Sequence, residues 1–220
     1  MEYYPIFLDI KDKPCVVIGG GKVAERKVLS LLDAGAKVCV ISPDVTPAIK
    51  RLACQKKIKI ISRAYKQGDV KGLFLVYSAT DNRTVSLMVF KEAQKNGILL
   101  NVVDVPELCN FIVPSVVERG ALLIAISTSG KSPAMAKKIR ERLEKEFGTE
   151  YGVFLDIMGK IREKVLTGSK EPDKNKKIFE ELVNSALLDL IRQKNKKEID
   201  SLLKRLLGSS FTLSKMKVKL

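Results

Sequence analysis

Three consecutive glycines, Gly19 to Gly21, are the residues whose spacing has the most specific chemical meaning in this sequence. They follow the apolar run Cys15 to Ile18, which is typical of a strand buried on both faces of a parallel sheet. From Lys22 onward, apolar residues recur at helical spacing, so we predict a strand, a tight turn and a helix. The free N–H groups and the positive dipole end of such a helix can bind phosphate groups.

The glycines also match the dinucleotide-binding pattern G-x-G-x-x-A. In this pattern Gly19 makes the turn, Gly21 lets the backbone approach a pyrophosphate, and Ala24 lets the helix lie close to the strand. The plain alternative is a glycine turn that only joins two elements. Because strand, glycines and helix follow one another as the pattern requires, we predict that a dinucleotide binds at this turn, Gly20 included.

The next predicted strand, Lys37 to Ile41, ends in Ser42, Pro43 and Asp44. An acidic residue after this strand contacts the adenosine ribose in many dinucleotide sites. Asp44 is therefore a candidate for that contact, although it lies beyond a proline and later than usual. It is equally suited to cap the helix that follows, so the choice between NAD and NADP stays open.

Two later predicted strands also end in polar residues. The strand Leu73 to Ala79 is followed by Thr80 and Asp81, and the strand Leu99 to Val103 is followed directly by Asp104. The carboxyl ends of parallel strands line the crevice in which ligands of such sheets bind. These residues are therefore candidates for ligand contact. For Asp104, a plain surface-loop carboxylate is the alternative that position alone favours.

Strands and helices alternate through the first half of the chain, which predicts an α/β fold with an open parallel sheet of Rossmann type. Tyr4 to Ile10 is an extended segment that we expect to form an edge strand. After Pro114 the pattern changes, and the segments Ser115 to Arg119 and Ala121 to Ser127 are predicted to form a β-hairpin.

The rest of the chain is predicted to be helical. Ser132 and Pro133 are suited to start a helix that ends near Phe147. Three apolar stripes at helical spacing follow, with a connecting loop expected from Thr167 to Lys177. We therefore expect three regions: a Rossmann domain in residues 1–113, a small α+β region in residues 114–148, and a helical C-terminal domain in residues 149–220.

The composition restricts the chemistry. The chain has no histidine, which excludes Ser–His and Cys–His nucleophile arrangements. Its four cysteines show no metal-binding spacing, so we predict no metal site. Acid–base chemistry must therefore be carried by carboxylates, lysines, tyrosines or thiols.

The formal net charge of +15 over 220 residues attracts anions. Nucleic acid, an acidic membrane and a polyanionic small molecule are all suitable partners, and a solvated lysine-rich surface is the plain alternative that charge alone favours. No apolar run approaches the ~20 residues of a membrane span, and the N-terminus lacks the features of a signal peptide. A cytoplasmic location is therefore expected.

Taken together and in this order, the motifs of the chain resemble those of the precorrin-2 dehydrogenase family, the siroheme synthase module that makes sirohydrochlorin. The motifs are Pro5 to Leu8, Gly19 to Lys27, Ala79 to Asp81, Asn101 to Asp104, Asn110 to Pro114 and Ser127 to Pro133. The resemblance covers about the first 150 residues. Ser129 departs from it, since the family more often has glycine there. The methyltransferase half of fused versions is also absent, so we expect a separate enzyme to supply the substrate.

The resemblance implies a homodimer whose dimerisation region is residues 114–148. It also implies NAD-dependent oxidation of precorrin-2 to sirohydrochlorin, with ferrous iron inserted at the same site in some members. The catalytic aspartate of the family falls on Asp104. The implied cofactor contacts are Gly19, Gly20, Gly21, Lys22, Val23, Ala24, Ser42, Pro43, Asp44, Thr80 and Asp81. The implied substrate contacts are Asn110, Phe111, Thr128, Ser129, Lys131 and Ser132.

A tetrapyrrole that carries many carboxylates suits a strongly basic protein, and we expect neither nucleic acid nor a membrane as a partner. Two other functions fit the fold: another NAD(P)-dependent oxidoreductase, and a dinucleotide-sensing or nucleic-acid-binding protein. The motifs Asn101 to Asp104 and Ser127 to Pro133 argue against both, because a sensor does not need them.

Overall fold

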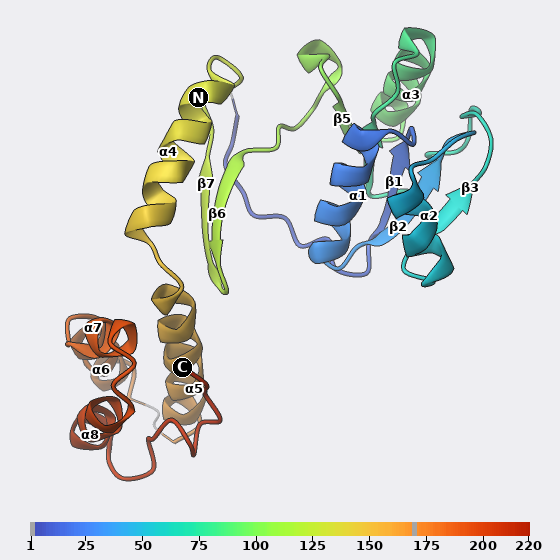
Figure 1. Ribbon diagram of the computed structural model, residues 1–220. Helices are drawn as coiled ribbons and strands as arrows, with labels where there is room; N and C mark the ends of the chain where they lie inside the picture. Colours follow the sequence, from blue (N-terminus) through green and yellow to red (C-terminus); the bar gives the residue numbers. More distant parts are fainter. Residues whose placement is uncertain (1–2, 169–170) are drawn as a thin grey trace. The chain divides into compact units, whose positions relative to one another are not determined.

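The first of the two units of the chain, Met1–Val113, is built on one sheet of five parallel strands (Figure 1). The strands are β1 (Pro14–Ile18), β2 (Lys37–Ile41), β3 (Lys59–Ile61), β4 (Leu75–Ser78) and β5 (Leu99–Val102). Their order is β3-β2-β1-β4-β5 and every neighbouring pair is parallel, which confirms the predicted Rossmann-type sheet. The direction of winding reverses between β1 and β4, where such sheets open a ligand crevice at their carboxyl edge.

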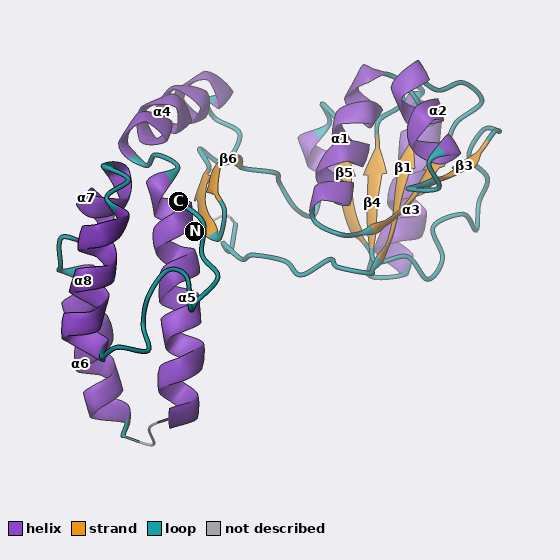
Figure 2. Ribbon diagram, turned by 60° about the horizontal axis from the view of Figure 1, so that its bottom comes forward, coloured by secondary structure: helices purple, strands orange, loops and turns teal. Residues whose placement is uncertain are grey.

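Helices cover both faces of this sheet (Figure 2). They are α1 (Lys22–Asp33), α2 (Pro47–Cys54) and α3 (Arg83–Lys95), and a short 3-10 helix η1 (Pro106–Leu108) follows β5. Successive side chains of a strand point to opposite faces. Cys15 and Val17 of β1 therefore join the core under α1 and α2, while Val16 and Ile18 join the core under α3. All four are buried, as their continuous apolar run predicted.

The segment Tyr4 to Ile10 is not the edge strand that we expected. It pairs with neither edge of the five-stranded sheet in the part of the chain that the structure describes, residues 3–168 and 171–220. The side chains of Tyr4 and Phe7 are 84% and 69% exposed. Only Ile10 is buried, in the core under α1. An extended apolar segment becomes a strand only when a neighbouring strand accepts its hydrogen bonds, and no strand within residues 3–168 and 171–220 pairs with this one.

The second unit, Pro114–Leu220, begins with an antiparallel hairpin. Strands β6 (Ser115–Arg119) and β7 (Leu122–Ile126) form it, and helix α4 (Pro133–Glu146) packs on it. Arg119 joins the two, because its Nε donates to the carbonyl of Phe147 at 2.8 Å and its Nη2 to that of Glu144 at 3.1 Å. These bonds satisfy carbonyls that the end of α4 leaves without helical partners.

Four helices complete the second unit: α5 (Glu150–Gly168), α6 (Pro172–Val183), α7 (Leu187–Arg192) and α8 (Lys196–Leu207). Their shared core consists of the apolar stripes that the sequence predicted, and its most buried members are Ile157, Ile161, Leu182, Leu187, Ile199 and Leu203. None of the described helices has the length and apolarity to span a bilayer.

The prediction of a connecting loop from Thr167 to Lys177 is wrong at both ends. Thr167 lies in the last turn of α5, and Pro172 is the first residue of α6. Residues 169 and 170 lie outside the described part of the chain. A proline lacks the N–H that the first helical position does not use, and its fixed φ suits that position. Pro172 therefore starts a helix here instead of extending a loop.

Two neighbouring residues of α6 test the packing of the helical unit. Leu182 is fully buried at 0%, whereas Val183 is 59% exposed. We expect Leu182→Ala to lower the free energy of unfolding by about 2–5 kcal/mol, because it leaves a cavity in the core. Val183→Ala should change it by less than about 0.5 kcal/mol. Urea-induced unfolding measures both, and equal losses would contradict the packing described here.

Candidate functional site

Gly19 makes the turn between β1 and α1 in a conformation that only glycine adopts without strain. Its φ is +114°, and a Cβ built there would lie 2.1 Å from the carbonyl oxygen of Ala79. Its N–H donates to the carbonyl of Ile41 at 2.9 Å. The turn therefore packs closely between the end of β2 and the end of β4.

Gly20 is held on the other side by the loop after β2. A Cβ at Gly20 would lie 1.9 Å from the carbonyl oxygen of Asp44. The Thr46 N–H donates to the Gly20 carbonyl at 2.9 Å, and the Ser42 hydroxyl donates to the Asp44 carbonyl at 2.6 Å. The dinucleotide pattern leaves this position free, yet the backbone contact here requires glycine.

Gly21 faces open space. A Cβ at this residue would meet no heavy atom of the described chain within 4 Å. Gly21 is the N-cap of α1 and has no side chain with which to bond the first N–H groups of that helix. Ala24 is buried against the sheet, and Lys22 and Val23 form the first turn. An open cradle of backbone donors at a helix N-terminus fits the phosphates of a dinucleotide.

The loop after β2 leaves the carboxylate of Asp44 exposed. The alternative that Asp44 caps α2 is wrong, because Thr46 is the N-cap and its hydroxyl accepts the N–H of Ile49 at 3.3 Å. A hydrogen bond with the Thr46 side chain also lowers the pKa of Glu25, and the nearby Lys22 ammonium adds to this effect. Because Asp44 is exposed and does not cap α2, its carboxylate remains available to a ligand at this edge.

The remaining predicted cofactor residues lie around the same turn. Pro43 is exposed next to Asp44. The N–H of Thr80 lies 3.3 Å from the Cβ position of Gly19, and the Thr80 hydroxyl accepts the N–H of Asn82 at 3.3 Å. Asp81 is exposed between them. The structure thus brings the glycine turn and the ends of β2 and β4 together, while their contacts with a cofactor stay a prediction.

Asp104 lies in a strained turn at the end of β5. Its φ is +60°, which is costly for a residue with a side chain. The Val103 N–H donates to the carbonyl of Ser78 at 2.9 Å, so Asp104 follows the carboxyl edge of β4 and β5 directly. Its carboxylate is exposed. Its role as the catalytic group stays a prediction.

The thiol of Cys109 supports this turn. Its Sγ lies 3.2 Å from the carbonyl of Val102 and 3.4 Å from that of Val105, and it accepts the Val102 N–H at 3.2 Å. Burial raises the pKa of the Cys109 thiol, which keeps it neutral. Nothing in the spacing of the cysteines indicated this role, because it depends on how the chain folds back after β5.

Asn110 has a comparable supporting role. Its side-chain oxygen accepts the Leu100 N–H at 2.8 Å, and its side-chain nitrogen donates to the carbonyl of Ile98 at 2.8 Å. Both ends of the amide therefore hold the free edge of β5. The predicted contact of Asn110 with a substrate is not tested by this arrangement.

Phe111, an implied substrate contact, lies on the α1 side of β4 and β5 in a row with Tyr77, Asn101 and Lys27, and sequence reasoning assigned no ligand contact to these last three. Tyr77 stands opposite Asn101 in the sheet, and the ring of Phe111 meets that of Tyr77 edge-on at 5.8 Å between centroids. The Asn101 amide donates to the Phe111 carbonyl at 3.1 Å. The ammonium of Lys27 lies 5.0 Å from the centroid of the Tyr77 ring. Burial raises the pKa of Tyr77 to about 12.

The predicted substrate residues of the second unit form the loop between β7 and α4. The Ser132 hydroxyl caps α4 by accepting the Met135 N–H at 3.2 Å, and the Thr128 hydroxyl accepts the Ser132 N–H at 3.1 Å. Ser129 has φ +51°, the left-handed conformation that favours glycine. Lys131 is exposed. A glycine at position 129 would adopt this backbone conformation without strain.

Within residues 3–168 and 171–220, no three cysteine, aspartate or glutamate side chains gather in a way that could hold a metal ion.

Two family descriptions match this chain. Residues 6–115 match the family described as "Putative NAD(P)-binding", and residues 119–146 match the "Sirohaem biosynthesis protein central" family. The chain belongs to the putative NAD(P)-binding family, whose match extends over half of its length. Its first match contains the glycine turn and Asp104, and its second contains the loop that caps α4.

The chain is also similar to curated proteins and to a solved structure. The chain is 39% identical over 191 residues to the siroheme synthase of Vesicomyosocius okutanii, covering 87% of this chain and 41% of the relative. It is 37% identical over 193 residues to that of Methylococcus capsulatus, covering 88% and 41%. It thus spans less than half of these siroheme synthases. The structure of SirC, precorrin-2 dehydrogenase, shares the fold with a TM-score of 0.77 and 23% identity, covering 90% of this chain and 100% of that one.

Two glycine variants separate the roles of the turn. We expect Gly20→Ala to lower the free energy of unfolding by about 1–3 kcal/mol, because the new Cβ overlaps the Asp44 carbonyl. Gly21→Ala should leave it within about 0.5 kcal/mol but weaken NAD binding by about tenfold or more, since the methyl group enters the cradle. Urea unfolding of the free protein and calorimetric titration with NAD measure the two effects. Unchanged NAD affinity in Gly21→Ala would remove the cradle from the cofactor site.

Proposed function

We propose that this protein oxidises precorrin-2 to sirohydrochlorin with NAD as the hydride acceptor. The observation that carries the proposal is the meeting of two features at one sheet edge, the open glycine cradle and the Asp104 carboxylate. The match of residues 119–146 to the sirohaem biosynthesis family and the similarity of the chain to siroheme synthases support the choice of substrate.

The reaction removes a hydride and a proton from the tetrapyrrole, and a bound nicotinamide supplies the site that takes up the hydride. The N–H groups at the start of α1 would hold the dinucleotide phosphates beside Gly21. Asp104 would accept the proton. A carboxylate is a suitable base here because the chain has no histidine. The turn held by Cys109 fixes the backbone from which Asp104 acts.

Asp44 supports NAD over NADP. Its exposed carboxylate follows β2 on the loop that touches Gly20. A carboxylate at this place accepts hydrogen bonds from the ribose hydroxyls of NAD, and it repels the additional phosphate of NADP.

The net charge of +15 also suits the proposed substrate. A basic protein raises the local concentration of a polycarboxylate tetrapyrrole through its long-range field. Ferrous iron is a candidate second substrate, because insertion into sirohydrochlorin would follow oxidation and would also release protons to a base.

The test is an anaerobic absorbance time course with enzymatically generated precorrin-2 and NAD, with ferrous iron added after the first phase. NADH together with a sirohydrochlorin spectrum would support the dehydrogenase. A further iron-dependent change above a protein-free control would support iron insertion. No NADH with either NAD or NADP would contradict the proposal.

In the same assay, Asp104→Asn should reduce kcat by about 10²–10⁴-fold, because it removes the base, and should leave the Kd for NAD unchanged. Asp12→Asn is the matched control, since Asp12 is also exposed, lies in the first unit and has φ +60°. It should leave kcat unaffected. An Asp104→Asn variant with wild-type turnover would remove Asp104 from the mechanism.

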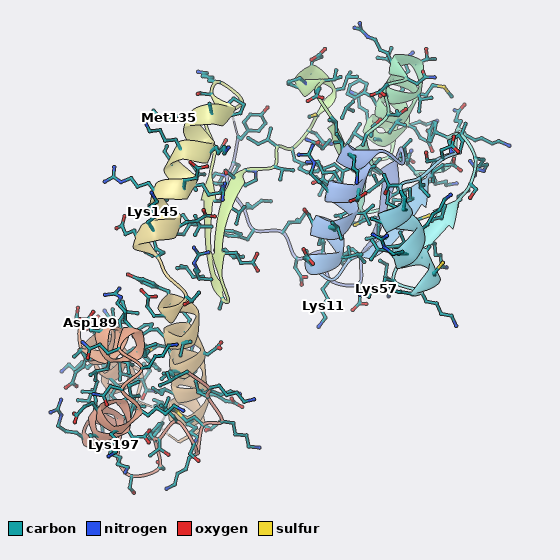
Figure 3. All side chains as sticks on the ribbon, in the orientation of Figure 1. Lys11, Lys57, Met135, Lys145, Asp189 and Lys197 are labelled. Carbon is teal, nitrogen blue, oxygen red and sulfur yellow. The ribbon has the colours of Figure 1, made fainter. Side chains whose placement is uncertain are left out.

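We also propose that two copies associate through the hairpin of the second unit. The outer face of the hairpin carries Val116 and Leu123, which are 39% and 44% exposed, and α4 carries Met135 at 53% (Figure 3). A two-stranded hairpin is only marginally stable by itself. Within the described chain, no third strand forms hydrogen bonds with β6 or β7. A second copy would cover these apolar side chains and pair the free edges.

Leu123→Arg should convert the dimer to a monomer, because it places a charge in the buried face of that interface. Leu166→Arg on α5 is the matched control, since Leu166 is also exposed, at 52%, but lies away from the hairpin. Sedimentation velocity at micromolar concentration distinguishes the two states. A monomeric wild-type protein, or a Leu123→Arg variant that stays dimeric, would exclude this interface.

A further inference from the structure

Lys27 occupies a place on α1 where an apolar residue is the ordinary choice. It lies three residues after the buried Ala24 and directly before the buried Val28, so it belongs to the side of the helix that faces the sheet. Its side chain is half-buried. The ammonium lies 5.0 Å from the centroid of the Tyr77 ring. No carboxylate in the described part of the chain lies within the 4.0 Å of an ion pair with it.

Lys27 lies next to the part of the sheet that β4 and β5 form. Helix α1 packs on β1 and β2, and α3 packs on β4 and β5 from the opposite face of the sheet. On the α1 side of the sheet, β4 and β5 therefore lie beside the two strands that α1 mainly covers. The side chains on that side include the buried Leu75 and Tyr77 of β4, Leu99 and Asn101 of β5, and Phe111. Lys27 lies at the border of this face and reaches over it.

The electrostatics connect Lys27 to Asp104. Burial lowers the pKa of Lys27, the neighbouring Arg26 lowers it further, and the charge of Asp104 raises it. The Asp104 carboxylate is therefore near enough to act on the ammonium, although the two form no direct ion pair. A cation that has lost part of its hydration and lacks a carboxylate partner gains more than an exposed lysine from binding an anion.

The position along α1 favours one kind of anion. Lys27 follows Gly21 by six residues, which is about 9 Å along a helix axis. The dinucleotide phosphates belong to the first N–H groups at Gly21, whereas the ammonium lies over β4 on the side of Asp104. An anionic group of the second ligand is thus the better match.

We propose that the Lys27 ammonium binds a carboxylate of the tetrapyrrole and thereby orients the macrocycle toward Asp104. A cation–π contact with the Tyr77 ring holds the ammonium in place. This inference rests on the proposed function, because it names the residue that recognises the proposed substrate. It assigns to Lys27 a role in binding, separate from the proton transfer at Asp104.

The experiment compares Lys27→Met with Lys27→Arg in the precorrin-2 assay. Lys27→Met keeps an unbranched chain on the Tyr77 ring and removes only the charge. We expect it to raise KM for precorrin-2 by about tenfold or more, with kcat within about twofold and the Kd for NAD unchanged. Lys27→Arg should restore most of the affinity. Lys91→Met is the control, because it removes the same charge from an exposed position on α3, and it should leave KM unchanged.

An equilibrium titration with uroporphyrin, a polycarboxylate tetrapyrrole, tests binding without turnover. Quenching of its fluorescence should report weaker binding by Lys27→Met and by Lys27→Gln than by the wild-type protein. Equal binding by all three proteins would overturn the inference, and so would a Lys27→Met variant with wild-type KM or with weakened NAD binding. If the wild-type protein makes no NADH yet binds uroporphyrin through Lys27, the proposed reaction fails and the binding role stands.

Discussion

The contact of backbone with backbone around the first two glycines is the constraint on which the site depends. The Gly19 Cα lies against the carbonyl of Ala79, and the Gly20 Cα lies against that of Asp44. Any side chain would push the ends of β2 and β4 away from the turn. Because neither glycine has one, both strand ends come within reach of Gly21, whose own surroundings stay open. The backbone is thus closely packed around Gly19 and Gly20, and the space next to Gly21 is open.

The turn after β5 follows a different principle. Asp104 has an unfavourable backbone conformation, and the residues that follow hold it there. The Cys109 thiol bonds to the turn itself, and the Asn110 amide bonds to the backbone of the preceding strand. A strained backbone conformation of this kind persists only where several independent contacts hold it in place. The carboxylate is therefore presented by a rigid support although it lies in an exposed loop.

The second unit combines a thin sheet with a well-packed helical core. Arg119 bonds to the carbonyls at the end of α4, and Gly120 lies close to Gly152 of α5, so hairpin and helices form one unit. The core of α5 to α8 is continuous and apolar. The hairpin has no such cover on its outer face, where Val116 and Leu123 are exposed. The apolar core of the helices stabilises this unit, and the outer face of the hairpin remains exposed.

Local patterns in the sequence determined the parallel sheet, the glycine turn and the apolar faces of the helices, because alternation, glycine and helical spacing act over a few residues. The same patterns were wrong for Tyr4 to Ile10, since a strand exists only through a partner elsewhere in the chain. Only the tertiary structure decided the need for glycine at position 20, the support that Cys109 gives to Asp104, and the place of Lys27 over Tyr77. Each of these depends on atoms far apart in the sequence, whose meeting no local pattern records.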